Sequence, residues 1–162
     1  MAVVAVALGS NLESRFGDRG ANLLEAVRRV GELGEVRRVS SFYETEPVGF
    51  VEQPRFLNGA MLLETALAPS ELMRGLLAVE QAMGRVRGVA KGPRVIDLDL
   101  LLYVDRDGSA VVMETAELAL PHPEMHERRF VLEPLAEIAP GMVHPVLGLT
   151  VTEILAGLGS DS

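Results

Sequence analysis

Two carboxylates, Asp97 and Asp99, stand two residues apart behind a run of cations. Side chains at that spacing on a β-strand point to the same side, so both carboxylates can converge on one point, while Ile96, Leu98 and Leu100 face the other way. Carboxylate oxygens suit Mg²⁺, which also holds the phosphates of a substrate. The pair therefore predicts a magnesium site. The alternative is an ordinary strand whose acidic side faces solvent.

The run of cations lies in residues 85–94 and contains four basic residues and two glycines, namely Arg85, Arg87, Gly88, Lys91, Gly92 and Arg94. Cations beside a carboxylate-bound metal are the usual ingredients of phosphoryl transfer. The segment has no periodic pattern, so we expect it to be mobile in the empty protein and to bring Arg87 to the phosphates only on closure. The alternative is an ordinary charged surface loop, but the neighbouring carboxylate pair favours a phosphate-binding segment.

Glu80 falls on or beside the apolar stripe that Leu76 and Leu77 form on a predicted helix. A carboxylate in that position needs a partner, and the arginines that begin at Arg85 are candidates. The alternative is a glutamate at the helix edge whose side chain reaches water.

Phe56 and Asn58 share one face of a strand predicted over residues 55–65. An aromatic ring beside an amide suits a flat heterocycle with paired donors and acceptors. The alternative is a core phenylalanine and an asparagine close to a turn.

His122 and His126 superficially resemble the histidine pair of a zinc protease motif. Glu124 is at the wrong place for that motif, and Pro123 prevents the helix that would align the two histidines, so we exclude a zinc site. His122 remains open as a phosphate ligand or as a capping residue. The sequence has neither a P-loop nor a dinucleotide-binding glycine motif, so a nucleotide would be held in another way.

Composition limits the protein class. The chain has 162 residues, of which 48% are hydrophobic, and this favours one globular domain over residues 1–162 with a sizeable core. There is no cysteine, which excludes disulfides and thiolate chemistry, and the formal net charge of −8 argues against a generic nucleic-acid binder. The apolar N-terminus lacks a basic leader and is typical of a buried strand. We expect a cytoplasmic monomer that binds small molecules, with no membrane or nucleic-acid partner.

The elements that must position these residues follow from hydrophobic periodicity. We predict strands over residues 2–8, 35–44, 55–65 and 94–104, and helices over about 18–33, from Pro69 onward, over about 125–138 and over about 150–158. A turn at 105–108 leads into 110–113 as a hairpin. This order is β-α-β-β-α-β followed by a hairpin and helices, an α+β fold of ferredoxin-like type. Its two helices would cover one face of a mainly antiparallel sheet and leave the other face free for a site.

Several segments together resemble one enzyme family, 6-hydroxymethyl-7,8-dihydropterin pyrophosphokinase. They span nearly the whole chain, and the most specific is GPRVIDLD; the segments are residues 7–11 (ALGSN), 39–45 (VSSFYET), 53–58 (QPRFLN), 84–87 (GRVR), 92–99 (GPRVIDLD), 121–122 (PH) and 128–135 (RRFVLEPL). The resemblance implies transfer of pyrophosphate from ATP to the hydroxymethyl group of a reduced pterin in folate biosynthesis, with Mg²⁺ required and AMP released.

The resemblance also implies roles for individual residues. Asp97 and Asp99 would hold two Mg²⁺ ions, and Asp97 would also adjoin the pterin. The pterin ring would lie between Phe56 and Phe130, with Asn58 on its polar edge and the backbone around Thr45, Pro47 and Val48 completing the pocket. The nucleotide would be contacted by Glu80, Arg85, Arg87, Arg94, Ile96, His122 and Arg128, and Arg85, Arg87 and Arg94 would act in catalysis.

No residue stands out as the general base, and the hydroxyl proton could leave late or to water. Two other classes remain open. One is a two-metal phosphohydrolase that uses the same carboxylates on a phosphate ester. The other is a non-catalytic ferredoxin-like domain that binds a regulator, which would need neither the arginines nor the paired carboxylates.

Overall fold

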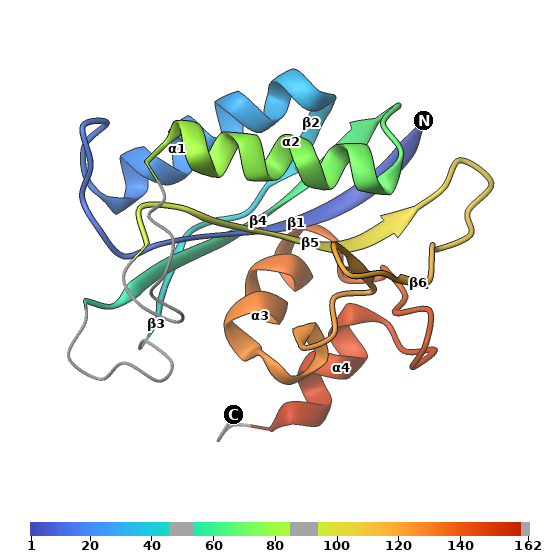
Figure 1. The fold of residues 1–162 in the computed structure, drawn as a ribbon. Coiled ribbons are helices and arrows are strands. Elements are labelled where there is room, and N and C mark those ends of the chain that lie inside the picture. Colours follow the sequence, from blue (N-terminus) through green and yellow to red (C-terminus); the bar gives the residue numbers. More distant parts are fainter. Residues whose placement is uncertain (46–53, 85–93, 160–162) are drawn as a thin grey trace.

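A single antiparallel sheet organises the chain. The computed structural model describes residues 1–45, 54–84 and 94–159. The strands of the sheet run in the order β2-β4-β1-β5, and β3 pairs with β4 beyond the end of β2 (Figure 1); their bounds are β1 Ala2–Ser10, β2 Glu35–Val39, β3 Tyr43–Thr45, β4 Phe56–Thr65 and β5 Asp97–Val104. The α+β class and the mainly antiparallel sheet are therefore confirmed, while the finer ferredoxin-like assignment stays a prediction.

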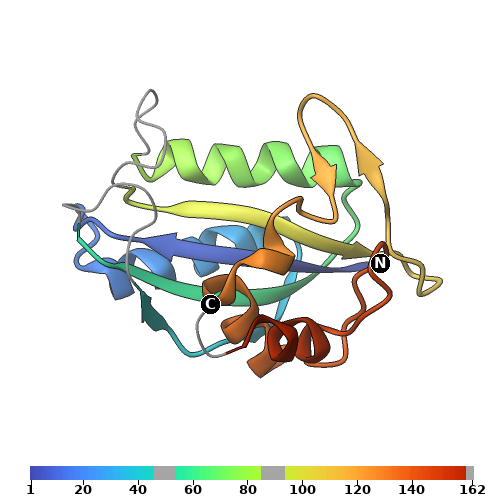
Figure 2. The same ribbon diagram turned by 90° about the horizontal axis from the view of Figure 1, so that it is seen from below.

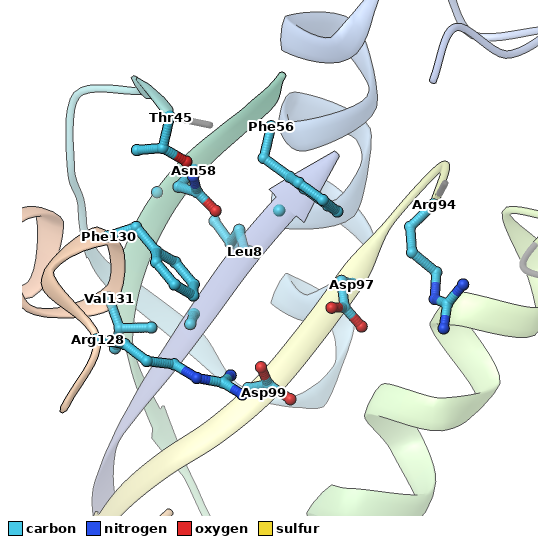
Figure 3. A pocket seen from close by; sticks show the side chains of 13 residues that line it. Leu8, Thr45, Phe56, Asn58, Arg94, Asp97, Asp99, Arg128, Phe130 and Val131 are labelled. Atoms are coloured by element: carbon cyan, nitrogen blue, oxygen red, sulfur yellow. Dashed lines mark hydrogen bonds between the residues drawn. The ribbon is translucent and has the colours of Figure 1, made fainter. Parts of the chain in front are cut away.

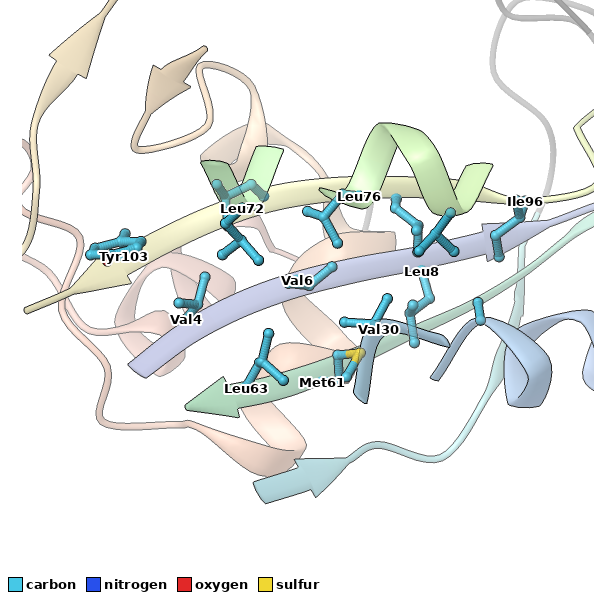
Figure 4. Packing of buried hydrophobic residues seen from close by; sticks show 14 of the residues in the cluster. Val4, Val6, Leu8, Val30, Met61, Leu63, Leu72, Leu76, Ile96 and Tyr103 are labelled. Carbon is cyan, nitrogen blue, oxygen red and sulfur yellow. The ribbon is translucent and has the colours of Figure 1, made fainter. Parts of the chain in front are cut away.

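Two helices cover one face of this sheet, as predicted. They are α1 (Arg19–Val30), which continues as the short 3-10 helix η1 (Gly31–Leu33), and α2 (Pro69–Ala82). Asp18 caps α1, since its side chain accepts a hydrogen bond from the backbone N–H of Ala21. The helices bury their apolar stripes against every second residue of the strands (Figure 4), and this core includes Val4, Val6, Leu8, Leu23, Val30, Met61, Leu63, Leu72, Leu76, Ile96 and Leu98.

The expectation that the second face is free to hold a site is correct only for part of that face. Helices α3 (Arg129–Ile138) and α4 (Val151–Leu158) lie across it, opposite α1 and α2 (Figures 1 and 2). They pack in a second cluster with Ala5, Ala7 and Ala60, whose small side chains allow a helix to approach the sheet closely. A site on this face is therefore confined to the part of the sheet beyond α3.

Three element boundaries differ from the prediction. The strand expected over 35–44 is interrupted after Val39, where the Ser40 hydroxyl accepts a hydrogen bond from the backbone N–H of Ala60 (2.9 Å). The helix expected over 125–138 is a 3-10 turn, η2 (Met125–Glu127), separated from α3 by Arg128 in an extended conformation. The strand expected from residue 94 begins at Asp97. In each case a contact or conformation that periodicity does not encode divides or shortens the element.

The turn at 105–108 is confirmed, with a hydrogen bond from Gly108 N–H to the carbonyl of Asp105 (2.9 Å) and a bridge between Val104 and Ala110. The regular strands that follow are β6 (Met113–Glu114) and β7 (Ala119–Leu120), which pair with each other. Within the described residues, no helix has both the length and the apolar character needed to cross a membrane.

Candidate active site

One pocket gathers most of the predicted residues. It lies on the sheet face that carries α3, where β1 ends and β4 and β5 begin, beside the N-terminus of that helix (Figure 3). Residues from five elements or their flanks line it, namely Ala7, Leu8, Gly9, Thr45, Phe56, Asn58, Gly59, Arg94, Asp97, Asp99, Arg128, Phe130 and Val131. Segments far apart in the sequence thus supply aromatic, amide, acidic and basic groups to one space.

The alternation of side chains along β5 places both acids on the pocket side of the strand. Leu98 and Leu100 are 3% and 2% exposed in the core beneath α1 and α2, so Asp97 and Asp99 are directed to the opposite face, as predicted. Figure 3 shows both carboxylates on the same side of the strand.

Gly9 of β1 forms the floor between the acids and the aromatic side of the pocket. In the ladder it is paired with Asn58 on β4 and with Asp97 on β5. A Cβ atom at Gly9 would lie 3.3 Å from Asn58 Oδ1, 3.6 Å from Phe56 Cδ1 and 3.9 Å from Asp97 Cβ. A side chain at this position would therefore enter the pocket. Gly9 lies in residues 7–11, one of the segments that carry the family resemblance, but a glycine has no side-chain chemistry from which this role could be predicted.

The aromatic side consists of Phe56 from β4 and Phe130 from α3. Figure 3 shows the two rings flanking the space in front of Asn58. Asn58 is 6% exposed, and its Nδ2 donates a hydrogen bond to Thr45 Oγ1 (2.5 Å), which fixes the orientation of the amide. A flat ring between the phenylalanines would meet a pre-oriented amide at its edge.

On the charged side, His122 approaches Asp99, with 3.9 Å between Nε2 and Oδ1. His122 Nδ1 accepts a hydrogen bond from the backbone N–H of Glu124 (3.1 Å), so in the neutral ring Nε2 carries the proton that faces Asp99. Burial, and then the positive charge of Arg128, lower the pKa of His122 below its usual value. Nδ1 therefore holds the local turn, as expected of a capping residue, and Nε2 faces Asp99. A phosphate contact of His122 stays a prediction.

Arg128 extends into the same region from the residue before α3. Its Nη2 lies 3.1 Å from Glu124 Oε2, and its guanidinium carbon lies 5.6 Å from the centroid of the Phe130 ring. Figure 3 shows the guanidinium beside Asp99. The extended backbone of Arg128, which separates η2 from α3, is what directs the arginine toward the acids and the phenylalanine into the pocket.

The donor set fits a hard divalent cation. Asp97 and Asp99 offer carboxylate oxygens on one wall, and the Asp99 side chain is 35% exposed, so it is accessible from solvent. The described ranges contain no cluster of three or more histidine, cysteine or acidic side chains that could enclose a metal. Two carboxylates without such a cage suit Mg²⁺, which keeps several waters and takes further oxygens from substrate phosphates.

Glu80 and Ile96 lie behind this wall. Glu80 is 1% exposed on the α2 side, and its Oε2 accepts a hydrogen bond from the backbone N–H of Leu98 (2.8 Å). The alternative of a helix-edge glutamate that reaches water is therefore wrong, because α2 packs directly against β5. The Ile96 side chain is fully buried in the core. Nucleotide contacts for both residues remain predictions, and at Ile96 only the backbone is suited to one.

Arg94 is held by Asn11, a residue that the sequence analysis did not single out. Asn11 is 1% exposed at the end of β1. Its Oδ1 accepts from the backbone N–H of Arg94 (2.6 Å), its own N–H donates to the Arg94 carbonyl (2.9 Å), and its Nδ2 donates to the Pro54 carbonyl (3.1 Å). One buried amide thus joins the segments that lead into β4 and β5. The signal available in the sequence was an asparagine that directly follows an apolar strand.

Pro47, Val48, Arg85 and Arg87, together with the expected closing segment 85–92, lie outside the described residues. Their predicted roles stay predictions.

Comparison with known proteins gives a consistent result. Residues 5–140 match the family model described as 7,8-dihydro-6-hydroxymethylpterin-pyrophosphokinase (HPPK). The chain is 45% identical over 138 residues to the 2-amino-4-hydroxy-6-hydroxymethyldihydropteridine pyrophosphokinase of Bacillus subtilis, covering 84% of this chain and 77% of the relative. It is 43% identical over 154 residues to the Pseudomonas aeruginosa protein of the same name, covering 94% and 90%.

Some relatives are much longer. The chain is 38% identical over 161 residues to the folic acid synthesis protein fol1 of Schizosaccharomyces pombe, covering 98% of this chain but only 21% of that protein. Among solved structures, Plasmodium falciparum HPPK-DHPS with SDX-DHP superimposes with a TM-score of 0.70 at 15% identity, covering 97% of this chain and 43% of that one. This last likeness concerns the fold.

Proposed function

The chain belongs to the 7,8-dihydro-6-hydroxymethylpterin-pyrophosphokinase family, and from that premise we propose that it transfers pyrophosphate from ATP to the hydroxymethyl group of 6-hydroxymethyl-7,8-dihydropterin. The pterin oxygen attacks the β-phosphorus, the bond from that phosphorus to the oxygen bridging to the α-phosphate breaks, and AMP leaves with that oxygen. The products are AMP, the pterin diphosphate and the proton of the hydroxyl group.

The observation that carries the proposal is the position of Gly9 between Asn58 and Asp97. The ring-binding side lies on β4 and the acidic side on β5, the two strands that flank β1, and at this position β1 has a residue without a side chain. A pterin held between Phe56 and Phe130 would thus direct its hydroxymethyl group toward whatever the acids hold. Proximity of two bound reactants is the main contribution that a protein makes to phosphoryl transfer.

Each group has a defined task in this proposal. Phe56 and Phe130 bind the ring faces, and Asn58, oriented by Thr45, binds the polar edge, with the backbone at Pro47 and Val48 completing the pocket. Asp97 and Asp99 hold two Mg²⁺ ions, which supply neutralisation of the triphosphate charge. The positive charge around the β-phosphate comes from Arg85, Arg87, Arg94, Arg128 and His122, with Glu80 and Ile96 close to the nucleotide.

Electrostatics and position suffice for this chemistry. No described residue is assigned as general base, and none is needed if the hydroxyl proton leaves late or to water. We further propose that residues 1–162 act as one domain and as a monomer in the cytoplasm, on small molecules only. The absence of cysteine supports the compartment, and the net charge of −8 supports small molecules over nucleic acid as partners.

The test is AMP release from ATP, measured with and without 6-hydroxymethyl-7,8-dihydropterin and with Mg²⁺ or a chelator. We expect AMP only when pterin and Mg²⁺ are both present, in equal amounts with the pterin diphosphate. Phosphate release from ATP or from phosphate esters without pterin would instead support the two-metal phosphohydrolase. Ligand binding with no turnover would support the regulatory domain.

A further inference from the structure

Glu137, in the last turn of α3, connects this helix to the edge of the sheet. Its carboxylate accepts three hydrogen bonds from the segment that leads into and forms β3: from the backbone N–H of Ser41 (2.9 Å), from the Ser41 hydroxyl (3.1 Å) and from the Tyr43 hydroxyl (2.6 Å). These donors lower the pKa of Glu137, with Tyr43 as the largest cause, so the group is ionised at neutral pH. Charge-assisted hydrogen bonds of this kind are the stronger ones in proteins.

Strand β3, whose Tyr43 donates one of these bonds, is short, and among the described residues it pairs with β4 alone. It contains three residues, and its pairs with β4 are Tyr43 with Asn58, Glu44 with Leu57, and Thr45 with Phe56. Thr45 also accepts the side-chain hydrogen bond of Asn58. Because a strand of this length is marginal by itself, the place of Thr45 depends on what anchors β3.

The same helix carries the opposite wall of the pocket. Phe130 and Glu137 are seven residues apart in α3, which is close to two helical turns, so they lie on one face of the helix. Phe130, which forms the aromatic wall, is near the N-terminus of the helix, and the Glu137 carboxylate, which accepts the hydrogen bonds from Ser41 and Tyr43, is near its C-terminus. Glu137 itself does not line the pocket.

We propose that Glu137 is a positioning residue for the pterin: it locks α3 to β3 and thereby sets the gap between Phe130 and the Thr45–Asn58 pair. The inference rests on the proposed function, since it names what fixes the width of the pterin site. The nucleotide side rests mainly on β5 and on Arg94, which Asn11 holds. Its one group beside α3, Arg128, lies at the opposite end of the helix from Glu137 and has its own ion pair with Glu124 (3.1 Å). Loss of Glu137 therefore weakens pterin binding selectively.

The experiment compares Glu137→Gln with Glu133→Gln. Glu133 is on the same helix and carries the same charge, but its carboxylate pairs with Arg129 (3.2 Å), so it is a matched control. Titration calorimetry would measure the Kd for 6-hydroxymethyl-7,8-dihydropterin and, separately, for a non-hydrolysable ATP analogue with Mg²⁺. We expect Glu137→Gln to raise the pterin Kd roughly fivefold, on the scale of a weakened exposed charge-assisted bond, and to leave the nucleotide Kd within about twofold.

Two further measurements separate positioning from general destabilisation. Tyr43→Phe, which removes only the hydroxyl, should reproduce part of the pterin effect, and the double variant should lose less than the sum of the single losses. The Asn58 side-chain amide resonances should shift in Glu137→Gln and not in Glu133→Gln.

The outcomes for the inference and for the proposed function are distinct. If the unaltered protein binds pterin and forms AMP but Glu137→Gln binds pterin as Glu133→Gln does, the positioning role is overturned and the function stands. Equal weakening of both ligands by Glu137→Gln also overturns it, because that is general destabilisation. If the unaltered protein neither binds pterin in the presence of the ATP analogue nor forms AMP, both fail.

Discussion

Glu80 Oε2 lies 2.8 Å from the backbone nitrogen of Leu98, the residue between the two acids of the pocket. Strand β5 ends the strand order β2-β4-β1-β5, so the N–H groups on its outer side have no strand partner in that path. Glu80 reaches from α2 to satisfy one of them. The buried carboxylate thus supports, from behind, the stretch of backbone that presents Asp97 and Asp99.

We predict that Glu80→Ala destabilises the fold by about 1–3 kcal/mol, because it leaves the Leu98 N–H buried without this acceptor. Glu80→Gln keeps an acceptor oxygen and should lose less. Urea unfolding of the unaltered protein and the two variants measures both effects. Titration of activity with Mg²⁺ should show that the alanine variant needs a higher Mg²⁺ concentration for half-maximal activity. Unchanged stability of Glu80→Ala would contradict the support role.

The second prediction concerns the metal ligands. Asp97→Ala and Asp99→Ala should each cost at least about 3 kcal/mol of transition-state stabilisation, which is a hundredfold or more in rate. The fold should persist, since Leu98 and Leu100 keep the core side of β5. AMP release measures the loss, and circular dichroism checks the fold. Asp107→Ala, which alters an exposed acid in the 105–108 turn, is the control. Near-normal turnover of Asp97→Ala would refute the metal assignment.

The third prediction separates the two substrates. Phe56→Ala and Asn58→Ala should each weaken pterin binding by roughly tenfold or more and leave ATP binding nearly unchanged, because their side chains lie on the aromatic side of the pocket. Calorimetry with each ligand alone measures this. Phe16→Ala is a matched control, because Phe16 packs beneath the arginines Arg15 and Arg29 and does not line the pocket. Similar losses for both ligands would indicate misfolding or a different site.

The fourth prediction tests the pocket floor. Gly9→Ala adds a methyl group 3.3 Å from Asn58 Oδ1, so it should displace the amide and fill space that the ring needs. We expect a rise of about tenfold or more in pterin Kd with a smaller change for ATP. Gly141→Ala serves as control, since a Cβ there would meet nothing within 4 Å. Normal pterin binding by Gly9→Ala would show that the bound ring does not lie against Gly9.

The strand patterns could be predicted because they are local. Alternation alone placed Asp97 and Asp99 opposite Leu98, and Phe56 beside Asn58, and the structure brings these four polar and aromatic side chains into one pocket. Period and composition determine which side of a strand a residue faces, whatever the rest of the fold does.

Other features depend on contacts between distant segments, which periodicity does not encode. Arg128 interrupts the helix expected over 125–138, and only tertiary packing selects that extended conformation. The covering of the second face by α3 and α4 follows from the alanines at positions 5, 7 and 60, whose small size is uninformative until the strands are paired. The partner of Glu80 is a backbone group, which no side-chain pattern reveals.

The last prediction concerns proton uptake at His122. Burial and the charge of Arg128 lower the pKa of His122, so without ligand the ring is mainly neutral at pH 7. A bound polyphosphate favours the protonated ring and should raise that pKa. ATP binding then takes up a proton in the window between the free and bound pKa values, and ATP affinity rises as the pH falls through that window.

NMR titration of the histidine ring protons, with and without Mg²⁺ and the ATP analogue, would measure this shift. His144 is an internal control: burial also lowers the pKa of His144, but its ring lies beside His126 and accepts hydrogen bonds from the backbone N–H groups of Val146 and Leu147, so its titration should not respond to the nucleotide. His122→Gln should remove the pH dependence of nucleotide affinity over the same window. If the nucleotide leaves the pKa of His122 unchanged, or shifts the pKa of both histidines alike, His122 does not face the phosphates and acts only through the turn held by its Nδ1.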